Sequence, residues 1–429
     1  MKERIAIIDG IRTPFAKAGT SLKNVPAQEL GAFIFKELLE RTGFPQDQID
    51  ELILGNVGQP SGAANIARVV ALKAGLDKKT PAYTVHRNCA SGMESITTAA
   101  NKILAGEADV ILAGGTESMS QYPLIFGKKM TSFFGSLSMA KTPAQKLGVL
   151  ATFRPSFLKP RIAVMEGLTD PICGMLMGNT AEVLAKEFHI DRDAQDQYAL
   201  QSHIKAEAAI QSGKFAEEIV PLPVFPKFKT VMSEDNGVRL GQSIEALGKL
   251  RPYFDRVNGS VTVGNACPLT DGAAAVLLMS ETKAKELGLK PMGFLRDYAY
   301  AGLDPHRMGL GPVFSSAKVF EKSGLTTEDM DLVEINEAFA VQVIANLKAW
   351  ESDDFCKKEL GLDKALGTID PAILNPNGGA IALGHPVGTT GTRMIITLLK
   401  ELKRQGKNRG LATLCIGGGQ GGAVILEVE

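Results

Sequence analysis

The sequence GEADVILAGG at residues 106–115 carries the pattern that decides the fold. A short apolar run ends in two glycines, and RGLATLCIGG at residues 409–418 has the same order. A second pair matches in the same way, because QIDELILGNV at 48–57 and DMDLVEINE at 329–337 each place acidic residues before a strand and an asparagine just past its end. Chance similarity between amphipathic segments is the alternative. The repeat predicts two similar halves.

Strand-like runs alternate with helical stretches in the first half. Residues 5–8, 51–54 and 110–113 are short and apolar, and 28–41 and 63–74 between them have helical patterns. Continuous apolar strands predict a parallel sheet covered by helices on both faces, and therefore an α/β protein. Ligands bind outside the carboxyl ends of strands in such sheets. A pseudo-twofold axis between the halves would bring these ends to one shared site.

Composition narrows the class of protein. The chain has 429 residues, so more than one packed unit is expected, and 47 Lys+Arg balance 47 Asp+Glu, which gives no reason to expect a nucleic-acid partner. The five cysteines are far apart and form no C-x-x-C pair, so we expect neither a metal site nor disulfides. The first strand begins at Ile5, which leaves no room for a signal or transit segment, and no apolar stretch is long enough for a membrane span. We expect a cytoplasmic location.

Residues 121–245 fit neither half and are predicted to form an inserted, mainly helical unit. Within residues 118–165 there is no Asp or Glu, although lysines and arginines are frequent. One apolar helix face is predicted from i, i+3, i+4 and i+7 spacing, at Met130, Phe133, Phe134 and Leu137. Thr142 and Pro143 predict the start of a second helix, with Leu147 and Leu150 facing inward. Such a basic amphipathic hairpin binds a membrane surface or a partner helix, or else covers its own domain with solvated lysines.

Cys89 is the first candidate for chemistry. It lies in YTVHRNCASGME at residues 83–94, where an apolar run ends and a helix is predicted to begin. A thiol at a helix N-terminus is close to the positive end of the helix dipole, which favours the reactive thiolate. The alternative is a buried cysteine that packs as a small apolar residue.

Three later segments carry groups that could act beside this thiol. Asn336 follows an apolar strand and either forms a turn or holds a water or carbonyl with its amide. His385 lies in a loop rich in glycine and proline and is a candidate base, although a lone histidine is often structural. Cys415 ends another strand, and its glycines at 417, 419 and 422 formally match G-x-G-x-x-G. A strand rather than a helix follows, so a dinucleotide site is excluded, and these glycines would instead bring backbone N–H groups to a thioester oxygen.

These segments, in this order, resemble the thiolase family over nearly the whole chain. The matching motifs are Arg12-Thr13-Pro14-Phe15, Asn88-Cys89-Ala90-Ser91-Gly92, Asn336-Glu337-Ala338-Phe339, Gly384-His385-Pro386 and Cys415-Ile416-Gly417-Gly418-Gly419. The resemblance implies two similar βαβαβαββ halves, stacked as a five-layered αβαβα sandwich, with an inserted loop domain. The first half would comprise residues 1–120 and 246–285, the insert residues 121–245, and the second half residues 286–429.

The resemblance also implies an acetyl-CoA C-acyltransferase that cleaves 3-ketoacyl-CoA with CoA in fatty-acid β-oxidation. Cys89 would attack the keto carbon, His385 would take the thiol proton, and Cys415 would protonate the departing acetyl-CoA enolate. The shortened acyl group would stay on Cys89 as a thioester until a second CoA, activated by His385, removes it. CoA is therefore a co-substrate, and no bound cofactor is expected.

Two oxyanions form along this route, and the resemblance assigns donors to each. A water held by Asn336 would serve the enolate together with His385. Backbone N–H groups of Cys89 and of the Gly417–Gly418 turn would serve the tetrahedral acyl centre. For CoA itself, the aligned positions are Met177, Arg239 and Cys267, with Arg239 against phosphate or adenine.

Within the family, the β-subunit of the trifunctional complex is the most similar branch. MGNTAE at 177–182, NACPLTDG at 265–272 and the basic insert at 126–165 resemble it, whereas that branch often has histidine at the position of Asn336. The branch implies longer acyl chains and a partner subunit with hydratase and 3-hydroxyacyl-CoA dehydrogenase activities. Peripheral membrane contact through residues 126–165 is a further expectation. Family members are usually homodimers or dimers of dimers.

Three other functions remain as alternatives. A biosynthetic acetoacetyl-CoA thiolase condenses two acetyl-CoA molecules with the same residues. Decarboxylating condensing enzymes share the wider fold but use no second reactive cysteine, so Cys415 argues against them. A non-catalytic scaffold would have no chemical need for Cys89, His385, Asn336 and Cys415 together.

Overall fold

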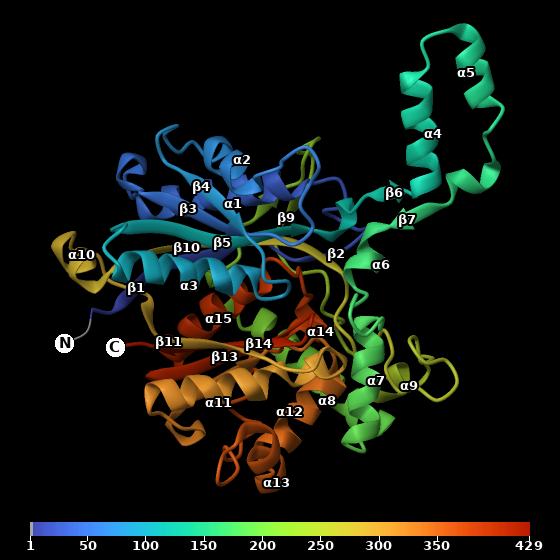
Figure 1. The fold of residues 1–429 in the computed structure, drawn as a ribbon. Coiled ribbons are helices and arrows are strands. Elements are labelled where there is room, and N and C mark those ends of the chain that lie inside the picture. Colours follow the sequence, from blue (N-terminus) through green and yellow to red (C-terminus); the bar gives the residue numbers. More distant parts are fainter. Residues whose placement is uncertain (1–2) are drawn as a thin grey trace.

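The computed structural model describes residues 3–429 and contains five layers of helices and sheets (Figure 1). One apolar core lies between α1 (Ala27–Thr42), α2 (Ile66–Lys73) and the first half-sheet. A second core surrounds the central helices α3 (Ser91–Leu104) and α15 (Thr390–Gln405), which pack between the two half-sheets. The third core packs under α11 (Gly311–Ser323) and α12 (Ala340–Trp350). The αβαβα sandwich expected from the sequence is confirmed.

The two half-sheets have the same strand order. In the first half this order is β4 (Ala82–Val85), β3 (Glu51–Gly55), β5 (Val110–Ser118), β10 (Thr270–Ser280) and β1 (Ile5–Arg12). In the second half it is an isolated bridge at Leu374, then β12 (Leu332–Ile335), β13 (Arg409–Ile416), β14 (Gln420–Glu427) and β11 (Gly293–Gly302). Short antiparallel pairing of Ile5–Ile7 with Gly293–Leu295 joins the halves into one sheet.

The internal repeat predicted from the sequence occupies equivalent positions in the two halves. Strand β3 corresponds to β12, and β5 corresponds to β13. Asn56 and Asn336 each follow the end of the equivalent strand. The two quoted sequence matches are therefore true structural repeats.

The prediction of a parallel sheet is correct only for β4, β3 and β5 and for β12 and β13. The remaining pairs of the large sheet are antiparallel. Strand β14 follows β13 through the tight turn at 417–419, and so short a connection can join only antiparallel strands. Both strands of that hairpin are nevertheless almost wholly buried, so their apolar pattern resembles that of parallel strands.

Arg12, at the end of β1, fastens the segment after α8 to the first half. Its guanidinium is fully buried and donates to Glu218 at 2.7 Å and to both carboxylate oxygens of Asp235 at 2.7 and 2.9 Å. Phe15 and Phe215 pack against its planar face. Because a buried charge requires partners, this ion-pair cluster fixes the insert where it meets the first half.

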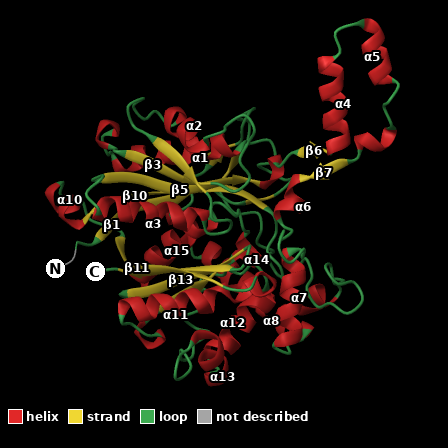
Figure 2. Ribbon diagram, viewed as in Figure 1, coloured by secondary structure: helices red, strands yellow, loops and turns green. Residues whose placement is uncertain are grey.

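Most of the remaining elements belong to the insert, and Figure 2 shows its helices α4 to α8 beside the two half-sheets. The insert and its borders contain β6 (Leu124–Phe126), α4 (Lys128–Met139), α5 (Pro143–Leu150), β7 (Pro160–Ile162), α6 (Ala163–Gly167), α7 (Met177–Glu187), α8 (Arg192–Gln211), β8 (Leu222–Pro223), β9 (Val231–Met232) and α9 (Ile244–Gly248). Elsewhere lie β2 (Ala16–Lys17), α10 (Glu281–Glu286), α13 (Asp353–Phe355) and α14 (Ala380–Leu383). Residues 1–2, where the first half was predicted to begin, lie outside the described residues. Among residues 3–429, no helix is both long and apolar enough to cross a membrane.

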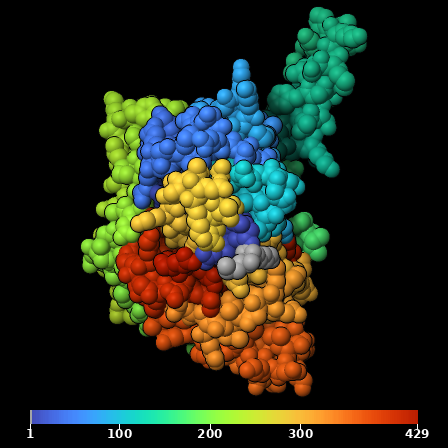
Figure 3. Space-filling model, turned by 90° about the vertical axis from the view of Figure 1, so that its left-hand side faces the viewer, coloured from blue at the N-terminus to red at the C-terminus, as the bar shows by residue number. Residues whose placement is uncertain are grey.

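Helices α4 and α5 form a hairpin that projects away from the body of the molecule (Figures 1 and 3). Its second helix begins as predicted, because the Thr142 hydroxyl accepts from the Gln145 backbone N–H at 3.2 Å and the Gln145 side chain accepts in return. The predicted inward orientation of Leu147 and Leu150 is wrong, since they are 67% and 49% exposed. A two-helix arm that stands away from the body has too few neighbours to cover these side chains.

Candidate active site

Cys89 lies in a tight turn between β4 and α3. Asn88 before it has a left-handed backbone, with φ of 42°, and its side chain donates to the Gly417 carbonyl at 2.7 Å. The Ser91 hydroxyl donates to the Asn88 carbonyl at 2.7 Å and accepts from the Arg87 N–H at 2.9 Å. The turn is therefore rigid, and Asn88 ties it to the glycine turn of the second half.

The Cys89 thiol is half-buried, and burial raises its pKa. A hydrogen bond with the Gly417 backbone opposes this shift, and the charge of Glu117 adds to it. The expected stabilisation of the thiolate by the start of α3 is therefore wrong for the resting site, because desolvation of the charged form outweighs it. Cys89 needs a base to become a nucleophile at neutral pH.

His385 has the protonation pattern of such a base. The Thr390 hydroxyl donates to the Pro386 carbonyl at 3.1 Å, so it accepts from His385 Nδ1–H at 2.6 Å. This leaves Nε2 with its lone pair free to accept a proton. Burial, supported by the charge of Arg393, lowers the His385 pKa to about 3, which keeps the ring neutral.

Gly384 gives the His385 loop its path. Its φ is 107°, and a Cβ there would lie 2.5 Å from Thr270 Oγ1. That hydroxyl accepts from the His385 backbone N–H at 3.1 Å, which fixes the loop to the start of β10. Only glycine permits both the backbone conformation and this approach.

The side-chain amide of Asn336 forms a long hydrogen bond with the unprotonated nitrogen of His385. Its Nδ2 is 3.5 Å from His385 Nε2, and its backbone N–H donates to the Thr413 carbonyl at 3.0 Å. The Asn336 Oδ1 is fully buried and has no hydrogen-bond partner among residues 3–429. A buried acceptor of this kind normally binds a water or a ligand, so Asn336 Oδ1 offers an acceptor for one next to His385.

Cys415 completes the group from the end of β13. It is 1% exposed, and burial raises its pKa well above the ordinary value, with the charges of Cys89 and Cys267 adding to the effect. Burial and the charge of Cys89 also raise the pKa of Cys267, to about 12. The three thiols thus share one electrostatic neighbourhood, and Cys415 is a protonated thiol at neutral pH.

A mainly apolar cavity of about 370 Å³ opens onto Cys89. Met177, Gly417 and Gly418 also line it, and the remaining lining residues come from both halves and from the insert: Val57, Asn88, Met119, Tyr122, Val164, Glu166, Gly167, Leu168, Thr169, Asp170, Pro171, Ile172 and Val387. Asn336, His385 and Cys415 do not line the cavity and are buried. The nucleophile Cys89 is therefore accessible from the cavity, whereas Asn336, His385 and Cys415 are buried.

Two of the residues expected to bind CoA, Met177 and Arg239, lie differently with respect to the cavity. Met177 lies at the start of α7, where its sulfur would be 3.4 Å from a Cβ on Gly417, so it contacts the glycine turn. Arg239 is exposed and lies outside the cavity, where its backbone N–H donates to His203 Nδ1 at 3.2 Å. Burial lowers the pKa of Lys17, and the charge of Arg239 adds to this effect. Arg239 therefore lies with another cation, away from the thiols.

Sequence reasoning missed Glu117 and Tyr122. Glu117 is fully buried at the end of β5, and burial raises its pKa to about 7. The Tyr122 hydroxyl donates to it at 3.1 Å, and the Tyr122 ring forms part of the cavity wall. The available signal was a single acidic residue in a strand that is otherwise apolar or small.

Comparison with known proteins gives the same family for both halves. The N-terminal thiolase domain matches residues 5–282, and the C-terminal thiolase domain matches residues 289–428. A 3-ketoacyl-CoA thiolase of Pectobacterium atrosepticum is 44% identical over 427 residues, 99% of this chain and 97% of that protein. One of Yersinia enterocolitica is 42% identical over 428 residues, 100% of this chain and 97% of that protein.

Solved structures agree with these relatives. The acetyl-CoA acetyltransferase of Bacillus anthracis has a TM-score of 0.87 and 39% identity, over 99% of both chains. Human mitochondrial 3-ketoacyl-CoA thiolase in complex with CoA has a TM-score of 0.85 and 36% identity, over 100% of this chain and 98% of that one. The chain belongs to the thiolase family and is an acyltransferase.

Proposed function

We propose that this thiolase cleaves 3-ketoacyl-CoA with CoA to give acetyl-CoA and a shortened acyl-CoA, through a thioester on Cys89. The observation that carries the proposal is the position of the unprotonated His385 Nε2 beside Asn336, in a site with two thiols of different accessibility. The relatives named 3-ketoacyl-CoA thiolase support this direction and a role in fatty-acid β-oxidation. Substrates and CoA would react in turn, in a ping-pong sequence.

In the first step, His385 Nε2 accepts the thiol proton of Cys89, and the sulfur attacks the keto carbon of the substrate. Because burial raises the Cys89 pKa, the sulfur stays protonated until a base accepts its proton. The neutral imidazole of His385 is that base. Backbone N–H groups of Cys89 and of the Gly417–Gly418 turn, which lines the cavity, would bind the oxyanion that forms.

Cleavage of the carbon–carbon bond then releases the enolate of acetyl-CoA. A water bound to the unpartnered Asn336 Oδ1 would donate to the enolate oxygen, and Cys415 would donate its thiol proton to the enolate carbon. The His385 imidazolium then returns its proton to the Cys415 thiolate, which restores both groups. In the second half-reaction, His385 takes the proton of an incoming CoA thiol, and the CoA sulfur displaces Cys89 from the acyl group. The same proton passes from His385 to the departing Cys89 sulfur.

CoA is the co-substrate in this scheme. Met177 contacts the glycine turn and lines the cavity, which suits a role against pantetheine. Cys267 lies close enough to Cys89 for the charge of Cys89 to add to burial in raising the Cys267 pKa. Arg239 would bind a CoA phosphate at the exposed end, and Lys17 beside it adds a second cation. No bound cofactor takes part.

The assay that tests the function compares thiolysis of acetoacetyl-CoA and 3-ketopalmitoyl-CoA, followed by loss of the 3-ketoacyl-CoA absorbance. Efficient cleavage of the longer substrate supports a degradative enzyme of the long-chain branch. A strong preference for acetoacetyl-CoA would support the biosynthetic alternative, which the similarity to an acetyl-CoA acetyltransferase favours. Absence of thiolysis with both substrates would refute the proposal.

A homodimer is the smallest assembly proposed. Strand β4 pairs only with β3, so one edge of the first half-sheet is open among the described residues, and its side chains are half-buried. An edge with free backbone groups favours pairing with a second copy. Because β4 runs directly into the Cys89 turn, such pairing would also brace the nucleophile. A monomer at micromolar concentration in light scattering would contradict this.

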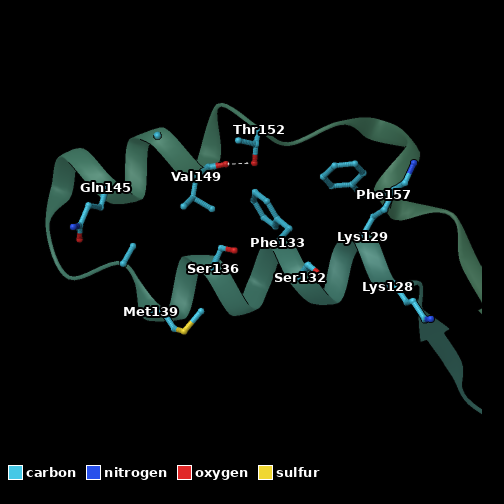
Figure 4. A pocket seen from close by; sticks show the side chains of 12 residues that line it. Lys128, Lys129, Ser132, Phe133, Ser136, Met139, Gln145, Val149, Thr152 and Phe157 are labelled. Carbon is cyan, nitrogen blue, oxygen red and sulfur yellow. Dashed lines mark hydrogen bonds between the residues drawn. The ribbon is translucent and has the colours of Figure 1, made fainter.

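For the hairpin we propose contact with an anionic membrane surface, in a cytoplasmic protein. Figure 4 shows the space between α4 and α5, a cavity of about 820 Å³ lined by Phe133, Val149 and Phe157 at its apolar part and by Lys128 and Lys129 at one end. Leucines and phenylalanines on the outside of the arm are exposed, and no acidic residue lies between 118 and 165. Exposed apolar groups among cations suit a surface of anionic lipid.

A partner subunit with hydratase and 3-hydroxyacyl-CoA dehydrogenase activities is a separate proposal, which rests on the branch resemblance.

A further inference from the structure

Glu117 is a buried carboxylate that the proposed chemistry does not use. It is 0% exposed at the end of β5, and five donors surround it. They are the backbone N–H groups of Val57, Gly58 and Gly388 at 3.0, 2.9 and 3.0 Å, the Asn56 side chain at 3.3 Å and the Tyr122 hydroxyl at 3.1 Å. None of these donors is a cation. A carboxyl group held only by neutral donors in the interior requires a reason, because its burial is costly.

The donors come from three segments that enclose the cavity. Val57 and Tyr122 both line it beside Cys89. Gly388 ends the loop that begins at His385, and Val387 between them also lines the cavity. One carboxylate therefore connects the loop of the base, in the second half, to a wall segment of the first half at Val57 and Gly58 and to the start of the insert at Tyr122.

The backbone segments around Glu117 are closely packed. A Cβ on Gly388 would lie 2.6 Å from Glu117 Oε2, and one on Gly115 would lie 2.0 Å from the Gly388 carbonyl. A Cβ on Gly58 would lie 1.8 Å from the Tyr122 ring. The backbone approaches so closely that a change in the hydrogen bonds of Glu117 must move the loop or the ring.

We propose that Glu117 is a positioning residue, whose carboxylate fixes the loop from His385 to Gly388 and the Tyr122 ring against the Cys89 turn. The inference rests on the proposed function, in which His385 acts on Cys89. It adds a residue that touches neither substrate nor the reacting sulfur. Misplacement of a catalytic group by about 1 Å costs up to about 100-fold in rate, so a positioning defect is measurable.

The electrostatics add an independent signal. Burial raises the Glu117 pKa to about 7, and ionised Glu117 raises the Cys89 pKa in turn. Tyr122 faces both groups, and the thiols Cys267 and Cys415 also face Cys89. Of these neighbours, only Glu117 carries a negative charge at pH 7 to 8. Removal of that charge lowers the Cys89 pKa.

The test uses full-length Glu117→Gln protein. Its amide NH₂ would face backbone donors, so at least one hydrogen bond is lost and the loop shifts. We expect kcat at pH 8 to fall about 10- to 100-fold with a smaller change in KM. The rate of Cys89 alkylation by iodoacetamide should reach half its maximum at lower pH than in the wild type. Alkylation needs no thiolysis, so this readout stands even where the proposed function fails.

Glu182→Gln is the matched control. Glu182 is also buried and accepts backbone N–H groups, from Ser260 and Val261, but it does not line the cavity. It should lower the melting temperature without moving the alkylation midpoint. Wild-type kcat and an unchanged midpoint in Glu117→Gln would overturn the inference.

Glu117→Asp is a second variant, which tests the proposal even if Glu117→Gln does not fold. It keeps the charge on a side chain one methylene shorter, so kcat should fall while the alkylation midpoint stays in place. Wild-type kcat in this variant would likewise refute a positioning role.

Discussion

His385 Nδ1 lies 2.6 Å from the hydroxyl of Thr390, the first residue of α15. The same hydroxyl donates to the Pro386 carbonyl, so the imidazole is fixed as the tautomer with its proton on Nδ1. The orientation of the base is thus decided by a threonine that lies outside the four motif residues Cys89, Asn336, His385 and Cys415.

Thr390→Val should remove this control at nearly constant volume. The buried Nδ1–H would lose its acceptor, which costs about 1–3 kcal/mol, and the ring would be free to change tautomer or rotate. We expect kcat/KM for thiolysis to fall about 10-fold or more. Thr390→Ser keeps the hydroxyl and should retain most of the activity, so equal losses in both variants would count against the tautomer argument.

Substitutions of the two thiols, Cys89 and Cys415, should affect different steps of the reaction. Cys415→Ser should still form the thioester on Cys89 from an acyl-CoA, detected as a mass increase of the intact protein, while overall cleavage is slowed by about 100-fold. Cys89→Ala should abolish both thioester formation and turnover. Wild-type turnover in Cys415→Ser would show that another group protonates the enolate.

The stability of the fold should depend on His385 below neutral pH. Its folded pKa, about 3, lies below the unfolded value of about 6.5, so the unfolded chain binds the extra proton between these values. The stability contributed by the neutral ring is therefore complete above pH 6.5 and is lost as pH falls toward 3. From pH 7 to pH 5 the loss is about 2 kcal/mol.

Burial raises the pKa of Glu117 to about 7, so Glu117 makes the folded state more stable on acidification. The pH dependence of the wild type alone therefore does not separate the contribution of His385 from that of Glu117. The measurement is the difference in unfolding free energy between wild type and His385→Gln in urea at pH 7 and at pH 5. The advantage of the wild type should shrink on acidification. A difference that is independent of pH would contradict the lowered pKa.

Arg12→Met should destabilise the whole chain. It would leave Glu218 and Asp235 buried without their cation, a loss of about 3–5 kcal/mol by comparison with other buried ion pairs. The expected readout is a melting temperature lower by several degrees. Arg4→Met is a suitable control, because Arg4 pairs with Glu281 at the surface and its loss should cost at most about 1 kcal/mol.

The hairpin should bind vesicles that contain about 30% phosphatidylserine and should release them at high salt, because each lysine near an anionic surface contributes about 1 kcal/mol. Lys128→Glu combined with Lys129→Glu should weaken flotation with such vesicles while thiolysis in solution is unchanged. Equal flotation with neutral vesicles would refute an electrostatic contact. Loss of a co-purified hydratase/dehydrogenase subunit in the same variant, with flotation intact, would assign the arm to a protein partner instead.

Much of the architecture was predictable because the repeat is local in sequence. The strands at 51–55 and 332–335 are marked by acidic turns before them and asparagines after them, which are signals within ten residues. The relative direction of paired strands was harder to predict from the sequence. Strand β10 pairs with β1 across more than 250 residues, and no local pattern records the direction of such a partner.

The candidate site followed the same division. The motifs identified Cys89, His385, Asn336 and Cys415, but the raised pKa of Cys89 depends on burial by both halves and was not predictable from the start of a helix. Glu117 was missed because four of its five partners come from loops about 60 or more residues away in the sequence. The exposure of Leu147 followed from the projection of the hairpin, which amphipathic spacing does not encode.

The bond from Asn88 to the Gly417 carbonyl has a consequence for biosynthesis. During translation, the cysteine turn emerges more than 300 residues before the carbonyl that holds it, and β14 must still be inserted between β13 and β11. A ribosome-bound chain that has just released the Cys89 turn therefore lacks His385 and the Gly417–Gly418 turn. The complete site can assemble only after both of these segments have been synthesised.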